Sequence, residues 1–323
     1  MNAIVVHAHG GPDVLSFEAV SERWPGPGEV LVANRAIGLN FIDTYYRTGL
    51  YTPPSLPYVP GGEGAGEIEA VGEGVTEFTP GDRVAYLSGF GAYADKTVVK
   101  ASTVVKLPGS IDFELGAASL LKGLTAEYLL HRTFKVQPGH TILVQAAAGG
   151  VGLILVQWAK HLGATVIGTV GSPEKAELAR ANGADHVILY REEDFVARVQ
   201  EITEGRKVDV VYDGVGKATF PASLDTLKPL GLFVSFGNAS GAIEAFNLGI
   251  LNQKGSLYVT RPSLNVYTAN RDIMLEQVEN LFRVLQEDVV KVPVNARFAL
   301  KDAADAHRAL EERATTGATV LLP

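Results

Sequence analysis

Apolar residues follow two different periods along this chain. In residues 1–100, short runs rich in β-branched residues alternate with glycine and proline, which predicts strands separated by turns. From Asp112 onward, apolar residues recur at the helical period of 3.6, and strand-like and helix-like segments then alternate as far as Thr260. The first pattern is typical of a β-rich module, and the second is typical of a parallel sheet covered by helices.

The periods also predict the individual elements. Strands are expected at 3–7, 14–20, 29–39, 64–71, 83–86 and 92–99, with one helical turn at 40–47 and an irregular loop at 50–60. A helix from 112 then leads to strands at 141–145, 165–170, 186–189, 208–212, 232–236 and 256–260, with helices from 152 and at 174–182, 193–203 and 217–227. A tail follows with a helix at 273–287, a strand at 295–298, a helix at 301–313 and a strand at 318–322. Because the alternating unit is complete by about residue 260, we expect the tail to return to the first module.

The segment 141–163 carries the clearest chemical signal. A short β-branched run leads into a turn of small residues, in which Ala147, Gly149 and Gly152 occupy the three positions of the dinucleotide fingerprint, with alanine replacing the first glycine. Gly149 permits a pyrophosphate to approach the backbone, and Gly152 permits close packing of strand and helix, whose N-terminus supplies free N–H groups. The spacing favours dinucleotide binding. A tight turn in another kind of parallel α/β sheet is the alternative.

Composition narrows the function classes. The 323 residues suffice for two domains, and 28 Lys and Arg against 36 Asp and Glu give a net charge of −8, which speaks against a general electrostatic grip on nucleic acid. The chain has no cysteine, which excludes disulfides, thiolate catalysis and cysteine-ligated zinc or iron–sulfur sites. With neither a membrane-length apolar run nor a signal-peptide pattern at its start, we expect a cytoplasmic location.

The second strand of the alternating unit predicts which cofactor binds. In an NAD-selective fold this strand ends in Asp or Glu, whereas here Val170 is followed by Gly171, Ser172, Pro173, Glu174 and Lys175. The carboxylate that would repel a 2′-phosphate is missing at the strand end, and a hydroxyl and an ammonium are within reach, so NADP is favoured. The alternative is that Lys175 is an ordinary solvated residue of a helix's first turn.

Several motifs in order carry a resemblance to a known family. They are N-F-I-D-T at 40–44, G-G-E-G-A-G at 61–66, P-G-D-R-V at 80–84, L-K-G-L-T at 121–125, A-A-A-G-G-V-G at 146–152, G-T-V-G-S at 168–172, V-S-F-G-N at 234–238 and R-A-T-T-G at 313–317. Over its full length the chain resembles the zinc-independent NADPH:quinone oxidoreductases, the zeta-crystallin-like branch of the medium-chain dehydrogenase/reductase superfamily. The resemblance implies an α/β fold. A GroES-like β-rich catalytic domain would comprise 1–122 and 263–323, and a Rossmann domain with a doubly wound parallel sheet would comprise 123–262, with NADP in the cleft between them.

The resemblance also implies which residues contact the cofactor. With the fingerprint positions, the set is Asn40, Phe41, Thr44, Tyr45, Tyr128, Ala147, Gly149, Gly150, Val151, Gly152, Gly171, Ser172, Lys175, Tyr190, Ser235, Phe236, Gly237, Asn238, Val259, Thr260, Arg261 and Arg313. Of these, Lys175, Tyr190 and Arg313 are expected to bind the 2′-phosphate, because two cations and a phenol provide charge-assisted hydrogen bonds.

The chemistry implied is reduction of a quinone by NADPH without a metal. Zinc-containing relatives have a histidine ligand at the position of Gly62 and a cysteine ligand near Asn40, and both are absent here. We expect Asn40, Tyr45 and Tyr51 to bind the acceptor oxygen or deliver protons, with Asp43 and Lys122 holding the network. The alternative is that the two tyrosines form apolar walls and water supplies the protons.

Other readings of the same pattern stay open at this stage. An NADPH-dependent enone or alkenal reductase needs the same cofactor and oxygen-binding groups. A non-enzymatic, crystallin-like role in binding NADPH or single-stranded nucleic acid is a second alternative, which the negative net charge disfavours. The resemblance further implies a homodimer or a larger assembly of dimers, formed by pairing of the edge strand within 255–262.

Overall fold

The computed structural model describes residues 1–312 and 314–323, so the predicted phosphate contact Arg313 lies outside the described residues. The chain divides into two compact units. Unit 1 comprises residues 1–124, 271–282 and 292–323, and unit 2 comprises residues 125–270 and 283–291. The limits at 122 and 262 inferred from the sequence stay a prediction.

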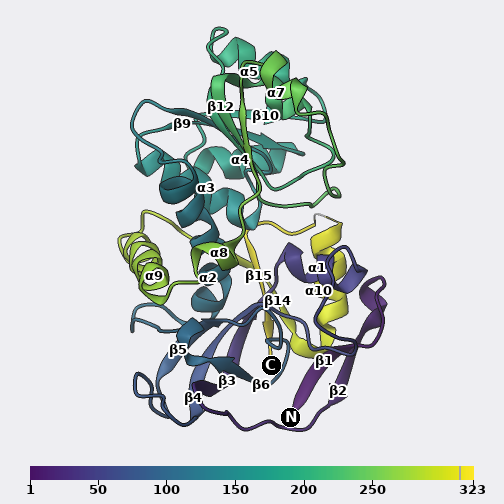
Figure 1. Cartoon of the computed structure of the whole chain (residues 1–323), viewed down its shortest axis with the longest axis vertical. Coiled ribbons are helices and arrows are strands. Elements are labelled where there is room, and N and C mark those ends of the chain that lie inside the picture. Colours follow the sequence, from purple (N-terminus) through teal and green to yellow (C-terminus); the bar gives the residue numbers. More distant parts are fainter. Residues whose placement is uncertain (313) are drawn as a thin grey trace. The chain divides into compact units, whose positions relative to one another are not determined.

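Unit 1 is built on a sheet that is antiparallel except for one parallel pair, β14 and β15 (Figure 1). Its strands are β1 (Asn2–Val6), β2 (Leu15–Ala19), β3 (Glu29–Gly38), β4 (Glu63–Val71), β5 (Arg83–Leu87), β6 (Lys96–Lys100), β7 (Val104–Lys106), β14 (Val294–Ala299) and β15 (Ala318–Leu322). The order is β14-β15-β3-β4-β5-β7, with β6 also paired to β3, while β1 and β2 form a separate ribbon. Its helices are α1 (Phe41–Thr48) and α10 (Ala303–Glu311), together with parts of α2 (Phe113–Tyr128) and α9 (Arg271–Gln286).

The tail of the chain completes this sheet. Strand β15 runs antiparallel to β3, with Val320 opposite Gly38, and carries β14 on its other side. In Figure 1 these two yellow strands lie among the dark strands of the first hundred residues. Helix α10 adds Ala303 and Ala306 to the same apolar core as the early strands. Burial of these small side chains explains why the tail belongs to unit 1.

Helix α1 follows β3 and lies within one residue of the predicted range 40–47. Its eight residues make about two turns, where a single turn was expected. The carboxylate of Asp43 accepts a hydrogen bond from the Asn40 amide at 2.9 Å, which satisfies one of the orphan donors at the helix start. Gly49 ends the helix in the left-handed conformation, with φ of 83°. Local capping at both ends therefore fixes α1 over two turns.

Unit 2 is built on a parallel sheet in the doubly wound order β10-β9-β8-β11-β12-β13 (Figure 1). The strands are β8 (Thr141–Val144), β9 (Thr165–Val170), β10 (His186–Leu189), β11 (Val208–Asp213), β12 (Leu227–Ser235) and β13 (Tyr258–Thr260). The helices are α3 (Gly150–His161), α4 (Pro173–Ala181), α5 (Phe195–Ile202), α6 (Ala222–Asp225), α7 (Gly249–Gln253) and α8 (Leu264–Tyr267). Because the strands are parallel, all their carboxyl ends lie at one edge, and the order reverses between β8 and β11.

Some element predictions were wrong in their limits. The helix predicted at 217–227 is confined to α6, because the amides of Lys217 and Ala218 donate to the Gly241 carbonyl and the Ser240 hydroxyl, and β12 already begins at Leu227. The strand predicted at 92–99 begins only at Lys96, because the residues before it pair with β1. Strand β7 was not predicted from the sequence.

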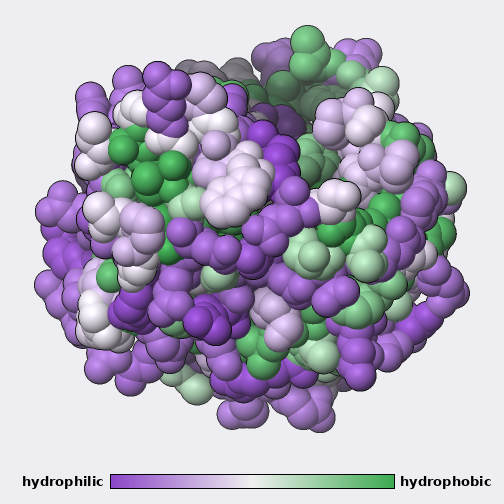
Figure 2. Space-filling view, turned by 90° about the horizontal axis from the view of Figure 1, so that it is seen from below, coloured by the Kyte–Doolittle hydropathy of each residue, from purple (hydrophilic) through white to green (hydrophobic). Residues whose placement is uncertain are grey.

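The surface seen in Figure 2 is mostly hydrophilic, with apolar residues in separate groups rather than one continuous patch. A continuous apolar patch would mark this face as a docking surface. In the described part of the chain, none of the helices combines the length and the apolar character that crossing a membrane requires.

The close pairing of β3 and β4 depends on glycine at position 66. A Cβ there would lie 2.0 Å from the carbonyl oxygen of Ala33. We expect Gly66→Ala to lower the free energy of unfolding, measured by urea denaturation, by about 3 kcal/mol, because the backbone must shift. In the control Gly62→Ala, the new Cβ would be 3.6 Å from the nearest atom, on Leu121, and stability should change little. Equal losses in both variants would contradict this account of the pairing.

Candidate functional site

The predicted cofactor residues of unit 2 lie after the carboxyl ends of the parallel strands. Residues 147–152 follow β8, residues 171–175 follow β9, and Tyr190 follows β10 directly. Residues 235–238 begin at the last residue of β12, and residues 259–261 include the end of β13. Parallel topology therefore brings these segments to one edge, which is where open α/β sheets bind ligands.

The turn between β8 and α3 has the geometry of an anion site. Gly149 is the N-cap of α3, and the amides of the first turn have no partner within the helix. A Cβ on Gly152 would lie 2.3 Å from the carbonyl oxygen of Ala146, so only glycine permits this approach of helix and strand. Ala146 itself has φ of 57°, a left-handed conformation that costs a non-glycine residue about 1–2 kcal/mol. The turn thus fits a pyrophosphate, with Gly150 and Val151 in the first turn as further backbone contacts.

The alanine in place of the first fingerprint glycine is accommodated by β9. Ala147 is fully buried, and a Cβ on Gly168 would lie 2.6 Å from the Ala147 methyl group. The missing side chain at position 168 therefore provides the space that the alanine needs. This neighbouring strand explains how the degenerate fingerprint keeps its turn.

The segment after β9 fits a phosphate at the next position along the sheet edge. Ser172 is the N-cap of α4 and its hydroxyl accepts the Lys175 amide at 3.4 Å, so Lys175 lies in the first helical turn. A Cβ on Gly171 would lie 2.7 Å from the Tyr190 hydroxyl, which places that phenol over the same turn. A helix N-terminus, an ammonium group and a phenol suit a 2′-phosphate.

The remaining cofactor residues of unit 2 lie on packed backbone. Gly237 lies against Gly214 after β11, where a Cβ on Gly237 would be 2.5 Å from the Gly214 oxygen. Tyr128 is buried at the end of α2 and stacks on Tyr267 with ring centroids 4.4 Å apart. Asn238 is buried beside these turns. The other predicted members lie within one residue of the ends of β12 and β13, and are Ser235, Phe236, Val259, Thr260 and Arg261.

In unit 1, a buried carboxylate organises the predicted catalytic residues. Glu63, at the start of β4, is fully buried and its Oε1 accepts the Asn40 amide Nδ2 at 2.7 Å and the Lys122 Nζ at 3.2 Å. Its Oε2 accepts the Leu121 amide at 2.7 Å. Both carboxylate oxygens are therefore satisfied, and the side chains of α1 and α2 meet on one group. Sequence reasoning quoted Glu63 within a motif but assigned it no role.

Asp43 continues this network away from Glu63. Its carboxylate accepts hydrogen bonds from the backbone N–H of Asn40 and from the Tyr93 hydroxyl, the latter at 3.1 Å. Burial raises the pKa of Asp43 to about 7, against the hydrogen bonds from Asn40 and Tyr93, which lower it; Glu63 raises it slightly and Lys122 lowers it. The structure thus connects Asp43 to Lys122 through Asn40 and the carboxylate of Glu63.

The predicted aromatic residues of unit 1 form one cluster. Tyr45 on α1 meets the ring of Tyr51 edge to face at 5.3 Å, and the Tyr51 amide donates to the Tyr45 carbonyl. Phe41 contacts Tyr45 with ring centroids 6.5 Å apart. Thr44, between them on the helix, bonds the Phe41 carbonyl at 2.7 Å. The rings of Phe41 and Tyr51 therefore both meet Tyr45 on α1.

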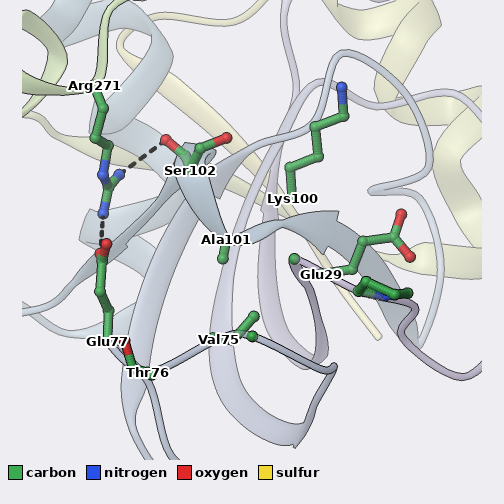
Figure 3. A pocket seen from close by; sticks show the side chains of 11 residues that line it. Glu29, Val75, Thr76, Glu77, Lys100, Ala101, Ser102 and Arg271 are labelled. Carbon is green, nitrogen blue, oxygen red and sulfur yellow. Dashed lines mark hydrogen bonds and ion pairs between the residues drawn. The ribbon is translucent and has the colours of Figure 1, made fainter.

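A pocket of about 420 Å³ in unit 1 is separate from these residues (Figure 3). It lies at the start of β3 and after the end of β4, whereas Asn40 and Glu63 lie at the opposite ends of the same strands. Arg271 there pairs with Glu77 at 3.1 Å and donates to the Ser102 carbonyl. None of the residues that line this pocket is a predicted site residue, and we do not assign the site to it.

Residue types in the network are unsuited to the zinc site of the zinc-containing relatives. The amide of Asn40 and the bare backbone of Gly62 replace the expected ligands, and the chain has no cysteine. Within residues 1–312 and 314–323, no three His, Asp or Glu side chains form a group able to hold a metal. The exposed His7 and His9 are engaged with the Glu18 carboxylate and the Tyr46 carbonyl.

Comparisons with known proteins show the family to which the chain belongs. Residues 26–109 match the alcohol dehydrogenase GroES-like domain, and residues 150–274 match the family described as zinc-binding dehydrogenase. The quinone oxidoreductase of Pseudomonas aeruginosa is 55% identical over 317 residues, which cover 98% of each chain. The chain belongs to the quinone oxidoreductase family. Its predicted membership of the medium-chain dehydrogenase/reductase superfamily is thereby confirmed.

Two further relatives of this quinone oxidoreductase family member match it over nearly its whole length. The crystal structure of Escherichia coli quinone oxidoreductase complexed with NADPH is 52% identical, covers 100% of both chains and gives a TM-score of 0.99. The 2-haloacrylate reductase of a Burkholderia species is 46% identical over 99% of this chain and 98% of its own. The predicted fold class, a GroES-like β-rich domain plus a doubly wound Rossmann domain, is confirmed.

Glu63 and Lys122 should be energetically coupled in this family member. We expect Glu63→Gln to lower the free energy of unfolding by about 3–5 kcal/mol, because it leaves the buried Lys122 ammonium without a counter-charge. The double variant Glu63→Gln with Lys122→Met should lose less than the sum of the two single losses in urea denaturation.

The surface pair of Arg297 and Glu114 serves as the control for this cycle. Glu114→Gln should cost at most about 1 kcal/mol, because both partners are solvated. Additive losses for Glu63→Gln and Lys122→Met would contradict the coupling.

The raised pKa of Asp43 predicts a pH-dependent stability. Because the pKa is about 7 in the fold and 3.8 as its ordinary value, the protonated group favours folding, and this contribution is lost as the pH rises from about 4 to about 7. Asp43→Asn has no proton to lose. In urea unfolding at a series of pH values, the free energy of unfolding of Asp43→Asn should therefore rise relative to that of the parent as the pH increases, by at most about 1.4 kcal/mol per pH unit.

Asp82 provides a control of opposite sign for this pH series. Its pKa is lowered by the hydrogen bond with Lys106, so its contribution is lost only as the pH falls below the ordinary range. Asp82→Asn should show a constant difference from the parent between about pH 5 and 7. A constant difference for Asp43→Asn as well would rule out a raised pKa at Asp43.

Proposed function

We propose that this chain is an NADPH:quinone oxidoreductase that transfers reducing equivalents from NADPH to a quinone without zinc. The observation that carries the proposal is the arrangement at the carboxyl edge of the unit 2 sheet. There the glycine turn before α3 is followed, one strand away, by Ser172 and Lys175 in place of an acidic residue. The relatives named quinone oxidoreductase and the NADPH complex of one of them support the same reaction and cofactor.

In this proposal two separate segments of unit 2 bind the pyrophosphate and the 2′-phosphate of NADPH. The first-turn amides of α3, at Gly150 and Val151, donate to the pyrophosphate. Ser172, Lys175 and Tyr190 hold the 2′-phosphate, for which an Asp or Glu at the end of β9 would be repulsive. Bound NADPH supplies the hydride for the acceptor.

The groups of unit 1 are suited to orienting a flat acceptor. Tyr45 and Tyr51 offer aromatic surface with phenol groups, and Asn40 offers an amide that Glu63 holds in one orientation. A quinone carbonyl is conjugated with an electron-poor ring, so hydrogen bonds and positioning suffice to assist its reduction to a diol. Asp43 and Lys122 act in this scheme by holding Asn40, and the site assignments of these five residues are part of the proposal.

We include a homodimer and a cytoplasmic location in the proposal. Strand β13 lies at the end of the sheet order, with Tyr258 and Val259 exposed by 61% and 37%. Such an edge offers unpaired backbone groups and apolar side chains for pairing with its copy about a two-fold axis. A small-molecule acceptor is the expected partner of the active site. The net charge of −8 is the basis for expecting no nucleic-acid partner.

Cofactor oxidation, followed by absorbance at 340 nm, tests this function. NADPH and, separately, NADH are mixed with 1,4-benzoquinone, 9,10-phenanthrenequinone or an alkenal. We expect quinone-dependent oxidation of NADPH to be much faster than that of NADH. Lys175→Ala should raise KM for NADPH at least about tenfold and leave that for NADH nearly unchanged, because one charge-assisted bond to the 2′-phosphate is lost.

Lys160→Ala is the matched control, because Lys160 lies at the far end of α3 and pairs with Asp185. It should leave both cofactor preferences unchanged. Equal use of NADH by the parent protein would disprove the phosphate site. Turnover of the alkenal alone would assign the protein to the double-bond reductases, a reaction class that the 2-haloacrylate reductase represents among its relatives.

A further inference from the structure

Three large polar side chains are buried in one hydrogen-bonded group that ends on Asp43. The exposed fractions of Arg47, Tyr93 and His307 are 1%, 0% and 0%. They come from α1, from the segment before β6 and from α10, yet all belong to unit 1. Burying a cation and an imidazole in an apolar core is costly unless their hydrogen bonds are satisfied. Their partners therefore define what this cluster does.

The donor and the acceptor of each hydrogen bond in this cluster can be assigned. Arg47 Nη1 lies 2.9 Å from His307 Nδ1, and since a guanidinium has only donors, Nδ1 must accept. The imidazole proton is thus on Nε2, which lies 3.0 Å from the Tyr93 hydroxyl and donates to it. Tyr93 then has its own proton to donate to Asp43 Oδ2. Burial and the neighbouring Arg47 lower the pKa of His307 to about 3, so the ring stays neutral.

This chain of bonds ends on the start of α1. Asp43 Oδ2 accepts hydrogen bonds from the Tyr93 hydroxyl and from the backbone N–H of Asn40. Asp43 therefore links the series of bonds that begins at His307 to the N-terminus of α1. Arg47, one turn later on α1, also donates to the Gly10 carbonyl at 3.1 Å. Its other nitrogen, Nη2, pairs with Glu311 of α10 at 2.6 Å. Two residues of α1 are therefore tied to α10, one directly and one through Tyr93.

We propose that His307 is a positioning residue that, through Tyr93 and Asp43, holds the first turn of α1 so that Asn40 and Tyr45 keep their orientation toward the acceptor. This inference rests on the proposed function. A purely structural role would lower stability without a specific effect on turnover. A positioning role lowers kcat beyond any loss of folded protein, and it accepts replacement by a side chain that makes the same two hydrogen bonds.

The decisive variant is Tyr93→Phe, because it removes one hydroxyl and interrupts the chain while leaving the Arg47 and His307 contact in place. We expect kcat with quinone to fall about 10- to 100-fold, with KM for NADPH within about twofold of the parent value. The matched control is Tyr86→Phe. Tyr86 is also fully buried in unit 1, and its hydroxyl donates to Asn34 instead, at 2.8 Å. It should keep the parent kcat.

His307 itself is tested by rescue. His307→Gln retains an oxygen to accept from Arg47 and an N–H to donate to Tyr93, so kcat should stay within about threefold of the parent value. His307→Leu makes neither bond and should lose activity at least as strongly as Tyr93→Phe. Equal kcat in Tyr93→Phe and Tyr86→Phe, or equal losses in the Gln and Leu variants, would overturn the proposal.

Amide hydrogen exchange of residues 41–48 gives a readout that does not depend on quinone reduction. Tyr93→Phe should accelerate exchange of this segment relative to both the parent and Tyr86→Phe, because the first turn of α1 loses an anchor. If the parent protein proves inactive with quinones, the proposed function fails while this test of the network still stands. Unchanged exchange in Tyr93→Phe would overturn the positioning role.

Discussion

The rest of unit 1 depends on the hydrogen bonds made by the buried carboxylate of Glu63. It receives three donors, from Asn40, Lys122 and the backbone of Leu121, and so joins the start of β4 to α1 and α2. A charge without solvent must find such partners, because its desolvation costs several kcal/mol. The backbone makes room for it as well, since a Cβ on Gly38 would lie 2.3 Å from Glu63 Oε1.

The same carboxylate organises the residues around it in a different way from a metal ion. A metal draws its ligands together by coordination, whereas here an ammonium, an amide and a backbone N–H converge on one anion. The result is a fixed orientation for the Asn40 side chain. In the proposed function, this amide orients the acceptor without polarising it strongly, which suits a substrate that is already electron-poor.

In unit 2 the constraint is steric rather than electrostatic. The turn before α3 brings backbone atoms so close that Gly152 admits no side chain, and it holds Ala146 in a left-handed conformation. Strained backbone of this kind persists where the surrounding structure fixes it. Here the fixing comes partly from β9, whose Thr169 carbonyl accepts the Ala147 amide at 3.0 Å. The geometry of this turn is therefore a product of two strands and not of the fingerprint alone.

The sequence by itself determined the two kinds of architecture, the order of the elements and the cofactor turn. Periods of two and 3.6 are local consequences of strand and helix geometry, and the spacing of Gly149 and Gly152 is a local property of one turn. The limits of 217–227 were wrong because tertiary contacts hold the first residues of this range outside a helix. The amides of Lys217 and Ala218 donate to the Gly241 carbonyl and the Ser240 hydroxyl.

Only the tertiary structure decided which polar residues share a core. His307 is one of seven histidines with no distinguishing sequence pattern, yet it lies between Arg47 and Tyr93, which are 260 and 214 residues away along the chain. Glu63 likewise meets Lys122 across 59 residues. Periodicity cannot reveal such pairs, because they join side chains from α1, α2, α10 and β4 that are distant in the sequence, and not from any local repeat. The burial of a charge is a property of the fold, and the fold assigned these residues their roles.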